Sequence, residues 1–324
     1  MGRLENGVWI DQWHNTKETK GRYVRKPSIF RNWITVDGEA GPTGKGGYLA
    51  EKDRYHLYIS WACPWAHRTL IFRAIKGLEN MISISGVNAI MRSKGWTFDD
   101  GYGVIPDNIN HSKYLYEVYL KEDNTYSGRV TVPLLWDKKT STIVNNESAD
   151  IIRMFNSAFD NIGAKEGDYY PDSLRDKIDN MNDFIYQNIN NGVYRSGFAT
   201  TQDAYDEAIE TLFLGLDKLD NILSKQKYLV GNIITEADWR LLPTLLRFDS
   251  VYHGHFKCNK RKLKEYDNLF NYAKELYQFP GISNTYDDKY SKEHYYGSHE
   301  TINPSGVIAH GPEFEFDTPH NRIK

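Results

Sequence analysis

The residue with the clearest chemical potential is Cys63, which stands between a predicted strand and a predicted helix. Side chains in 55–60 alternate with the period of two that a strand has, and apolar residues in 64–76 recur at helical spacing. Pro64 suits the first helical position, because its missing N–H would have no partner there. A thiol at such a junction meets unpaired N–H groups and the positive end of the helix dipole. Both stabilise the thiolate, so the sequence predicts a nucleophilic cysteine at position 63.

The simpler interpretation of Cys63 is that of a small buried apolar residue, which is the commonest role of a lone cysteine. The Cys-Pro-Trp-Ala sequence at a strand–helix junction favours the catalytic role, because the junction stabilises the thiolate as well as burying the group. A dithiol redox motif carries a second cysteine three positions later, where this chain has Ala66. We therefore expect a mixed disulfide on Cys63 to be resolved by a thiol from outside the chain.

Composition limits the classes of function. With 324 residues, of which 40% are apolar, the chain is long enough for two domains with real cores. A net charge of −3 gives no basic footprint for nucleic acid, and no window of about 18 apolar residues predicts a membrane span. The N-terminus has no hydrophobic signal core, and two cysteines make no disulfide framework, so we expect a protein of the reducing cytoplasm. No metal site is predicted.

The order of the predicted elements indicates a fold of class α/β plus all-α. Residues 1–48 show no sustained periodicity and are interpreted as an extended N-terminal arm. Residues 49–160 follow the order β-α-β-α-β-β-α of a thioredoxin-like domain. Its elements are predicted as strands 55–60, 81–87, 130–136 and 142–144 and helices 64–76, 111–121 and 148–159. After a linker, 173–324 are predicted to form an all-helical domain that ends in irregular chain from about Tyr286. Its helices are predicted at 173–190, 201–223, 235–249 and 263–277.

Two further motifs could hold a ligand with a peptide-like backbone. Pro133 interrupts an apolar strand, which either a cis bond after Val132 or an ordinary edge strand can explain. A cis bond would turn the backbone groups of Val132 outward, where they could pair with such a ligand. Ser148 is a good N-cap for the helix that follows, whose free N–H groups could bind a carboxylate while Glu147 binds an ammonium group. The alternative for this pair is a plain cap beside a solvated glutamate.

Taken together, these motifs resemble the glutathione site of glutathione transferase-like proteins. The resemblance rests on the string Cys63–Arg68, on Val132-Pro133 and on Glu147-Ser148. A thioredoxin-like half followed by an all-helical half with a Thr235–Asp238 capping pair is similar too. More narrowly, the long arm, the Ser-x-Ala-Cys-Pro-Trp-Ala-His-Arg string and the Ile302-Asn303-Pro304 tail look like the Xi class, the glutathionyl-hydroquinone reductases. The resemblance covers essentially the whole chain.

The resemblance implies a role for each site residue. Cys63 is implied as the nucleophile and Tyr194 as the proton donor, while Tyr252 and Tyr296 line the aromatic substrate pocket and help to keep Cys63 ionised. The residues implied to hold glutathione are Trp96, Arg129, Val130, Thr131, Val132, Glu147 and Ser148. The spacing of the tyrosines does not by itself indicate these roles, because without the resemblance each is more simply an ordinary packed or exposed tyrosine.

The implied reaction reduces glutathionyl-hydroquinones to hydroquinones through a Cys63–glutathione mixed disulfide and releases oxidised glutathione. Glutathione is then a co-substrate, and a homodimer is expected from the family. The alternatives are an Omega-like thiol transferase or dehydroascorbate reductase, a non-catalytic interaction module of the same fold, and conjugation of glutathione to electrophiles. The intact Cys63 argues against the module, and a cysteine suits disulfide chemistry better than conjugation.

Overall fold

The computed structural model describes residues 2–322. Contacts divide the chain into two units, and each unit gathers several stretches of sequence. The first unit consists of the chain up to Trp13, Pro27–Gly167 and Thr285–His294, and the second of His14–Lys26, Asp168–Asn284 and the chain from Tyr295 onward. Both ends of the chain thus contribute to both units, whereas the sequence patterns predict consecutive segments.

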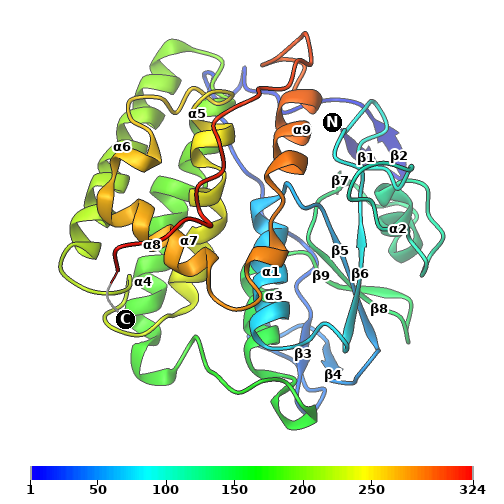
Figure 1. Ribbon diagram of the computed structural model, residues 1–324. Coiled ribbons are helices and arrows are strands. Elements are labelled where there is room, and N and C mark those ends of the chain that lie inside the picture. The colour runs from blue at the N-terminus through cyan, green and yellow to red at the C-terminus, as the bar shows by residue number, and fades with distance from the viewer. Residues whose placement is uncertain (1, 323–324) are drawn as a thin grey trace. The chain divides into compact units, whose positions relative to one another are not determined.

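The first unit is built on a four-stranded sheet with helices on both faces. Its strands are β5 (Tyr55–Ile59), β6 (Ile82–Gly86), β8 (Leu134–Asp137) and β9 (Thr142–Asn145), and its helices are α1 (Pro64–Ile75), α2 (Leu115–Glu122) and α3 (Ser148–Ser157). The strand order is β6-β5-β8-β9, with β5 parallel to β6 and antiparallel to β8. Helices α1 and α3 lie along one face of the sheet and α2 along the other (Figure 1). This arrangement confirms the thioredoxin-like domain.

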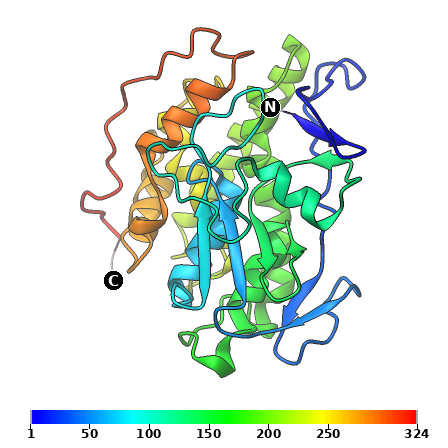
Figure 2. The ribbon, with the colours of Figure 1, turned by 90° about the vertical axis from the view of Figure 1, so that its right-hand side faces the viewer.

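The N-terminal arm contains short strands that sequence patterns do not predict. They are β1 (Arg3–Glu5), β2 (Val8–Ile10), β3 (Trp33–Thr35) and β4 (Gly47–Leu49). The hairpin β1–β2 pairs through β1 with β7 (Gly128–Arg129), and Figure 2 shows it beside α2. The ring of Trp9 on this hairpin stacks on Tyr116 of α2, with 5.0 Å between the ring centroids. Strands this short show too few alternations to give a periodic signal.

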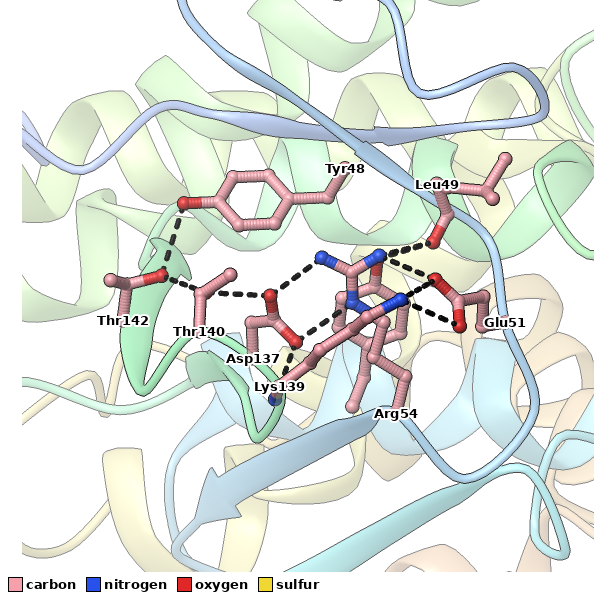
Figure 3. A network of polar contacts seen from close by, with 9 residues as sticks. Tyr48, Leu49, Glu51, Arg54, Asp137, Lys139, Thr140 and Thr142 are labelled. Atoms are coloured by element: carbon pink, nitrogen blue, oxygen red, sulfur yellow. Dashed lines mark hydrogen bonds and ion pairs between the residues drawn. The ribbon is translucent and has the colours of Figure 1, made fainter.

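A polar network joins the start of β5 to the β8–β9 hairpin (Figure 3). The Arg54 guanidinium donates to the two carboxylate oxygens of Asp137, at 2.8 and 2.7 Å, and to Glu51 at 2.7 Å. Burial by itself would raise the pKa of Asp137, but the hydrogen bonds from Arg54 and Thr140 outweigh it and hold that pKa below its usual range. Asp137 therefore stays ionised and holds the turn end of the hairpin against β5.

His56 is buried in the sheet between two serines of β6. The Ser85 hydroxyl donates to the Pro106 carbonyl at 2.9 Å, so it accepts a hydrogen bond from Nε2 of His56 at 3.0 Å. Nδ1 then accepts from the Ser83 hydroxyl at 2.7 Å, which holds the neutral ring in one tautomer. Burial lowers the pKa of His56 from 6.5 to about 4.

We expect acid to destabilise the protein through His56. Because its pKa is lower in the folded than in the unfolded chain, its contribution to stability is complete above the unfolded value of 6.5 and is lost as the pH falls towards 4. The difference between the two pKa values of His56 corresponds to about 3 kcal/mol in the free energy of unfolding. Urea unfolding at about pH 7 and about pH 4 measures the decrease in the free energy of unfolding between the two pH values. We expect this decrease to be smaller in His56→Gln by the amount that His56 contributes. Parallel losses in the two proteins would contradict the prediction.

The second unit is all-helical, as the sequence predicts. Its helices are α4 (Arg175–Ile185), α5 (Gly192–Gly197), α6 (Gln202–Leu223), α7 (Glu236–Leu246) and α8 (Asp267–Tyr277). Helix α5 packs on α6, α4 packs on α7, and α8 packs on both α6 and α7. The predicted capping box starts α7, where Asp238 Oδ2 accepts the N–H of Thr235 at 2.7 Å. The chain then passes through a π-helical turn, Phe248–Tyr252. No helix within residues 2–322 combines the length and the apolar character needed to cross a membrane.

The prediction of irregular chain from Tyr286 is wrong, because α9 (Asp288–Ser298) follows almost at once. Asp287 marks its start, where its carboxylate accepts the N–H of Tyr290 at 2.8 Å as an N-cap does. Its buried side chains recur at helical spacing, but they are tyrosines, serines and histidines. They are Tyr290, Ser291, His294, Tyr295 and Ser298. A search for apolar periodicity misses such a helix, since a polar stripe is buried in place of an aliphatic one.

Candidate active site

Cys63 is the N-cap of α1, at the strand–helix junction that the sequence predicts. Its backbone is extended, with φ −76° and ψ 117°, and Pro64 follows as the first helical residue. The Cys63 carbonyl accepts the N–H of His67 at 2.9 Å, which closes the first turn of the helix. The thiol is partly exposed, whereas the other cysteine, Cys258, is fully buried. Burial raises the pKa of Cys258 far above its ordinary value, so Cys63 is the thiol suited to nucleophilic chemistry.

The chain just before β8 lies next to this thiol. The Cys63 Sγ donates to the carbonyl of Val132 at 3.4 Å, and the Val132–Pro133 peptide is cis, the first of the two alternatives raised by the sequence. The neighbouring Thr131 is bonded within the protein, since its N–H and its carbonyl both pair with the Tyr119 hydroxyl, at 3.2 and 2.9 Å. The side chain of Val130 is buried. Of the three residues 130–132, Val132 is therefore the one whose backbone the structure brings to Cys63.

Glu147, and not Ser148, caps α3. The Glu147 carboxylate accepts the N–H of Ala149 at 3.1 Å and the hydroxyl of Ser28 at 3.1 Å. Ser148 is the first residue of the helix and is buried. The prediction that Ser148 is the N-cap is therefore wrong, because the longer glutamate side chain reaches the second N–H of the helix from one position earlier. Both residues nevertheless lie at a helix start, where N–H groups and the helix dipole favour an anion.

Arg129 connects β7 with the N-terminal arm. Its Nη1 donates to the carbonyls of Gly2 at 3.1 Å and Gln12 at 3.0 Å, and its guanidinium carbon lies 5.6 Å from the ring centroid of Trp13. The resemblance to glutathione transferases implies that this side chain helps to hold glutathione. In the structure, the contacts of Arg129 described above are with the N-terminal arm. Its part in binding glutathione stays a proposal.

Trp96 lies in the insertion between β6 and α2, and only 8% of it is exposed. Its ring stacks on the imidazole of His294, with 4.8 Å between the centroids and 25° between the planes. Sequence reasoning missed His294, because a stacking partner so distant in the chain leaves no local pattern. Trp96 is thus a packed residue whose ring is stacked on an imidazole from α9.

Three tyrosine hydroxyls meet within the helical unit. Tyr295 on α9 is bonded to Tyr194 on α5 at 2.6 Å and to Tyr252 of the π-helical turn at 3.2 Å. Tyr252 and Tyr295 are buried, and Tyr194 is partly exposed. Burial raises the pKa of Tyr295 well above its ordinary value, so this hydroxyl keeps its proton. We call these residues the tyrosine cluster.

The tyrosine cluster can release one proton and stabilise the anion left behind. Each hydroxyl carries one proton and can also accept, so Tyr295 can donate to one neighbour while it accepts from the other. When Tyr252 donates to Tyr295 and Tyr295 donates to Tyr194, Tyr194 keeps its own proton. A phenolate formed at Tyr194 then accepts the short bond from Tyr295. Tyr194 is also the partly exposed member, so it is the best placed to act as an acid.

Tyr296 points away from this cluster. Its hydroxyl donates to the backbone carbonyl of Ser250 at 3.4 Å, and its ring centroid lies 4.8 Å from that of His255. Successive residues of a helix point about 100° apart, so the hydroxyls of Tyr295 and Tyr296 have different partners. The resemblance implies that Tyr296 lines the substrate pocket with Tyr194 and Tyr252, and this role stays a proposal. The hydroxyl that is bonded to Tyr194 and Tyr252 is that of Tyr295. Two adjacent tyrosines offer no local signal for choosing between them.

Known proteins match nearly the whole length of this chain. Residues 62–158 match the glutathione S-transferase N-terminal domain, and residues 202–275 match the glutathione S-transferase C-terminal domain. The chain is 56% identical to the glutathionyl-hydroquinone reductase YqjG of Escherichia coli, over 99% of this chain and 98% of that protein. It is 52% identical to the glutathionyl-hydroquinone reductase PcpF of Sphingobium chlorophenolicum, over 96% of each. The glutathione-bound structure of YqjG matches 99% of both chains with a TM-score of 0.91 and 54% identity. A Xi-class transferase of Natrialba magadii matches with a TM-score of 0.90 and 43% identity, over 99% of this chain and 96% of that one.

The chain belongs to the Xi class of glutathione transferases. Each unit of this Xi-class protein contains groups that can do chemistry. The thioredoxin-like unit holds a partly exposed thiol at a helix start, beside the backbone of Val132. The helical unit holds the tyrosine cluster, which can give up a proton. Residues 2–322 contain no group of three or more His, Cys, Asp or Glu side chains placed to hold a metal ion.

Proposed function

We propose that this Xi-class protein reduces glutathionyl-hydroquinones to hydroquinones with glutathione as co-substrate. The observation that carries the proposal is the identity of 56% and 52%, over nearly the whole chain, with two curated glutathionyl-hydroquinone reductases. Two features of the separate units support it, because a thiol capping α1 and a cluster of tyrosine hydroxyls are the two groups that such a reduction needs.

The first half of the reaction transfers glutathione to Cys63. The thiolate attacks the sulfur of the thioether, and the bond between that sulfur and the aromatic carbon breaks. The bonding electrons stay on the carbon, which takes a proton from Tyr194 and leaves as the hydroquinone. Cys63 and glutathione are then joined in a mixed disulfide. Tyr295 and Tyr252 stabilise the phenolate of Tyr194 until it is reprotonated.

The second half regenerates the enzyme. The thiolate of a second glutathione attacks the glutathione sulfur of the mixed disulfide, and the Cys63 thiolate leaves. One glutathionyl-hydroquinone and one glutathione thus give one hydroquinone and one oxidised glutathione. Ala66 stands where a resolving cysteine would, so the external thiol has no competitor at that position.

The residues proposed to hold glutathione lie in the thioredoxin-like unit. The backbone of Val132 would pair with the peptide, as a strand does, beside the attacking thiol. Ser148 and the start of α3 would bind a carboxylate, and Glu147 would bind the ammonium group. Trp96, Arg129, Val130 and Thr131 complete the proposed set.

The test is to incubate the protein with a glutathionyl-hydroquinone and glutathione and to measure free hydroquinone and oxidised glutathione. We expect both products in equal amounts. Dehydroascorbate and a small mixed disulfide serve as comparison substrates. Rapid reduction of these without release of hydroquinone would refute the proposal in favour of an Omega-like activity.

We further propose that the protein acts as a homodimer in the reducing cytoplasm. The chain has two cysteines and so no disulfide framework, which supports a reducing compartment, where glutathione is also available. Light scattering on the purified protein tests the dimer, and a mass equal to one chain, 37.6 kDa, would refute it.

A further inference from the structure

The first half of α9 is bonded to the insertion that carries Trp96. The Nδ1 of His294 donates to the carbonyl of Ala89 at 2.7 Å. One helical turn earlier, the hydroxyl of Tyr290 donates to the carbonyl of Val87. Both carbonyls belong to the segment that directly follows β6. Two side chains of α9, four residues apart on the helix, therefore bind this segment.

The bond to Ala89 determines how the imidazole of His294 lies. A carbonyl can only accept, so Nδ1 carries the proton and the ring is held in one orientation. The face of this ring then stacks on Trp96, and both side chains are more than nine-tenths buried. The insertion therefore fixes His294 through Ala89, and His294 in turn covers one face of the Trp96 indole.

The N-terminal hairpin holds the same insertion just before Trp96. The Trp9 indole N–H donates to the carbonyl of Ser93 at 2.7 Å. A Cβ at Gly95 would lie 2.6 Å from the Trp9 ring, and φ at Gly95 is +74°, so only glycine fits this close approach. The backbone around Trp96 is thus held by Trp9, while the remaining freedom of the indole is limited by His294.

We infer that His294 is a positioning residue for Trp96 in the binding of glutathione. This rests on the proposed function, in which Trp96 contacts the tripeptide. His294 lies on α9, which is not one of the elements of the thioredoxin fold. Its side chain then sets the glutathione affinity of the thioredoxin-like unit. The stack, and not the hydrogen bond to Ala89, is the contact that acts on Trp96.

The test measures the dissociation constant of glutathione by titration calorimetry in the full-length protein. His294→Ala removes both contacts and is expected to raise this constant about 3- to 10-fold, the value of an aromatic stack. His294→Phe keeps the stack without the donor, and we expect a constant within about twofold of wild type. His294→Asn keeps an amide donor for the Ala89 carbonyl without the ring, and we expect it to bind as weakly as His294→Ala.

Two further variants make the outcomes distinct. Trp96→Ala tests the assigned role of Trp96 and is expected to raise the constant about tenfold or more. Lys289→Ala, at a largely exposed position on α9, is the matched control and is expected to bind like wild type. An unchanged constant in Trp96→Ala would refute its part in the proposed function. The positioning role alone would be refuted if Trp96→Ala raised the dissociation constant of glutathione and His294→Ala left it unchanged. It would also be refuted if His294→Asn bound glutathione like wild type and His294→Phe did not.

Discussion

Cys63→Ser is expected to reduce the release of hydroquinone from glutathionyl-hydroquinones by more than about 1,000-fold while glutathione still binds. A serine hydroxyl at the N-cap of α1 keeps the shape of the site, but it is not ionised near neutral pH and cannot form the mixed disulfide. Product analysis measures the loss of turnover, and calorimetry measures glutathione binding. Mass spectrometry is expected to find glutathione on Cys63 of the wild type after exposure to the thioether, and none on the variant.

Cys258→Ser is the matched control for this experiment. Cys258 is the other cysteine, and its thiol is fully buried, with a pKa that burial raises far above the ordinary value. We expect this variant to keep wild-type turnover and the adduct on Cys63, even where it loses some stability. Turnover by Cys63→Ser at the rate of the wild type would rule out the nucleophilic role.

Tyr194→Phe is expected to lower the turnover of glutathionyl-hydroquinones about 100-fold or more, which is the usual contribution of a general acid. The leaving group is an aromatic carbon, and it departs only with a proton. A small mixed disulfide has a sulfur leaving group that needs no such proton at neutral pH, so its reduction is expected to stay near the wild-type rate. Comparison of the two substrates separates loss of the acid from damage to the site.

Tyr295→Phe and Tyr296→Phe then decide which of the adjacent tyrosines belongs to the tyrosine cluster. Tyr295→Phe removes the 2.6 Å hydrogen bond to Tyr194, and we expect a loss of about tenfold in hydroquinone release. The Tyr296 hydroxyl donates to the Ser250 carbonyl, so Tyr296→Phe is expected to stay within about twofold of wild type. A larger loss in Tyr296→Phe than in Tyr295→Phe would support the assignment made from sequence and contradict ours.

Much of the fold follows from local patterns. The strand 55–60 and the helix 64–76 were predictable because their side chains repeat with the periods of a strand and a helix, and the structure has them as Tyr55–Ile59 and Pro64–Ile75. The capping box of α7 was equally readable, since Thr235 and Asp238 interact across three positions. Helix α9 was not predictable from apolar periodicity, because its buried face consists of tyrosine, histidine and serine.

For the proposed glutathione site, the sequence predicts residues but not the hydrogen bonds that they make. Glu147 and Ser148 were assigned to the start of α3, but which of them caps the helix depends on how far each side chain reaches. Arg129 was assigned to the ligand, yet its bonds to the carbonyls of Gly2 and Gln12 arise only when the arm folds back and β1 pairs with β7. Such contacts join residues far apart in the chain and leave no periodic trace.

By itself, the sequence predicted the nucleophile and its chemistry. A cysteine followed by proline between a strand and a helix is a local arrangement, and its helix start stabilises a thiolate whatever else the chain does. Only the tertiary structure decided which side chains from distant parts of the chain lie together. Tyr295 and not Tyr296 meets Tyr194 and Tyr252, because neighbours on a helix point in different directions. His294 covers Trp96 because the start of α9 is bonded to the chain that leaves β6, a contact that packing creates and no local pattern encodes.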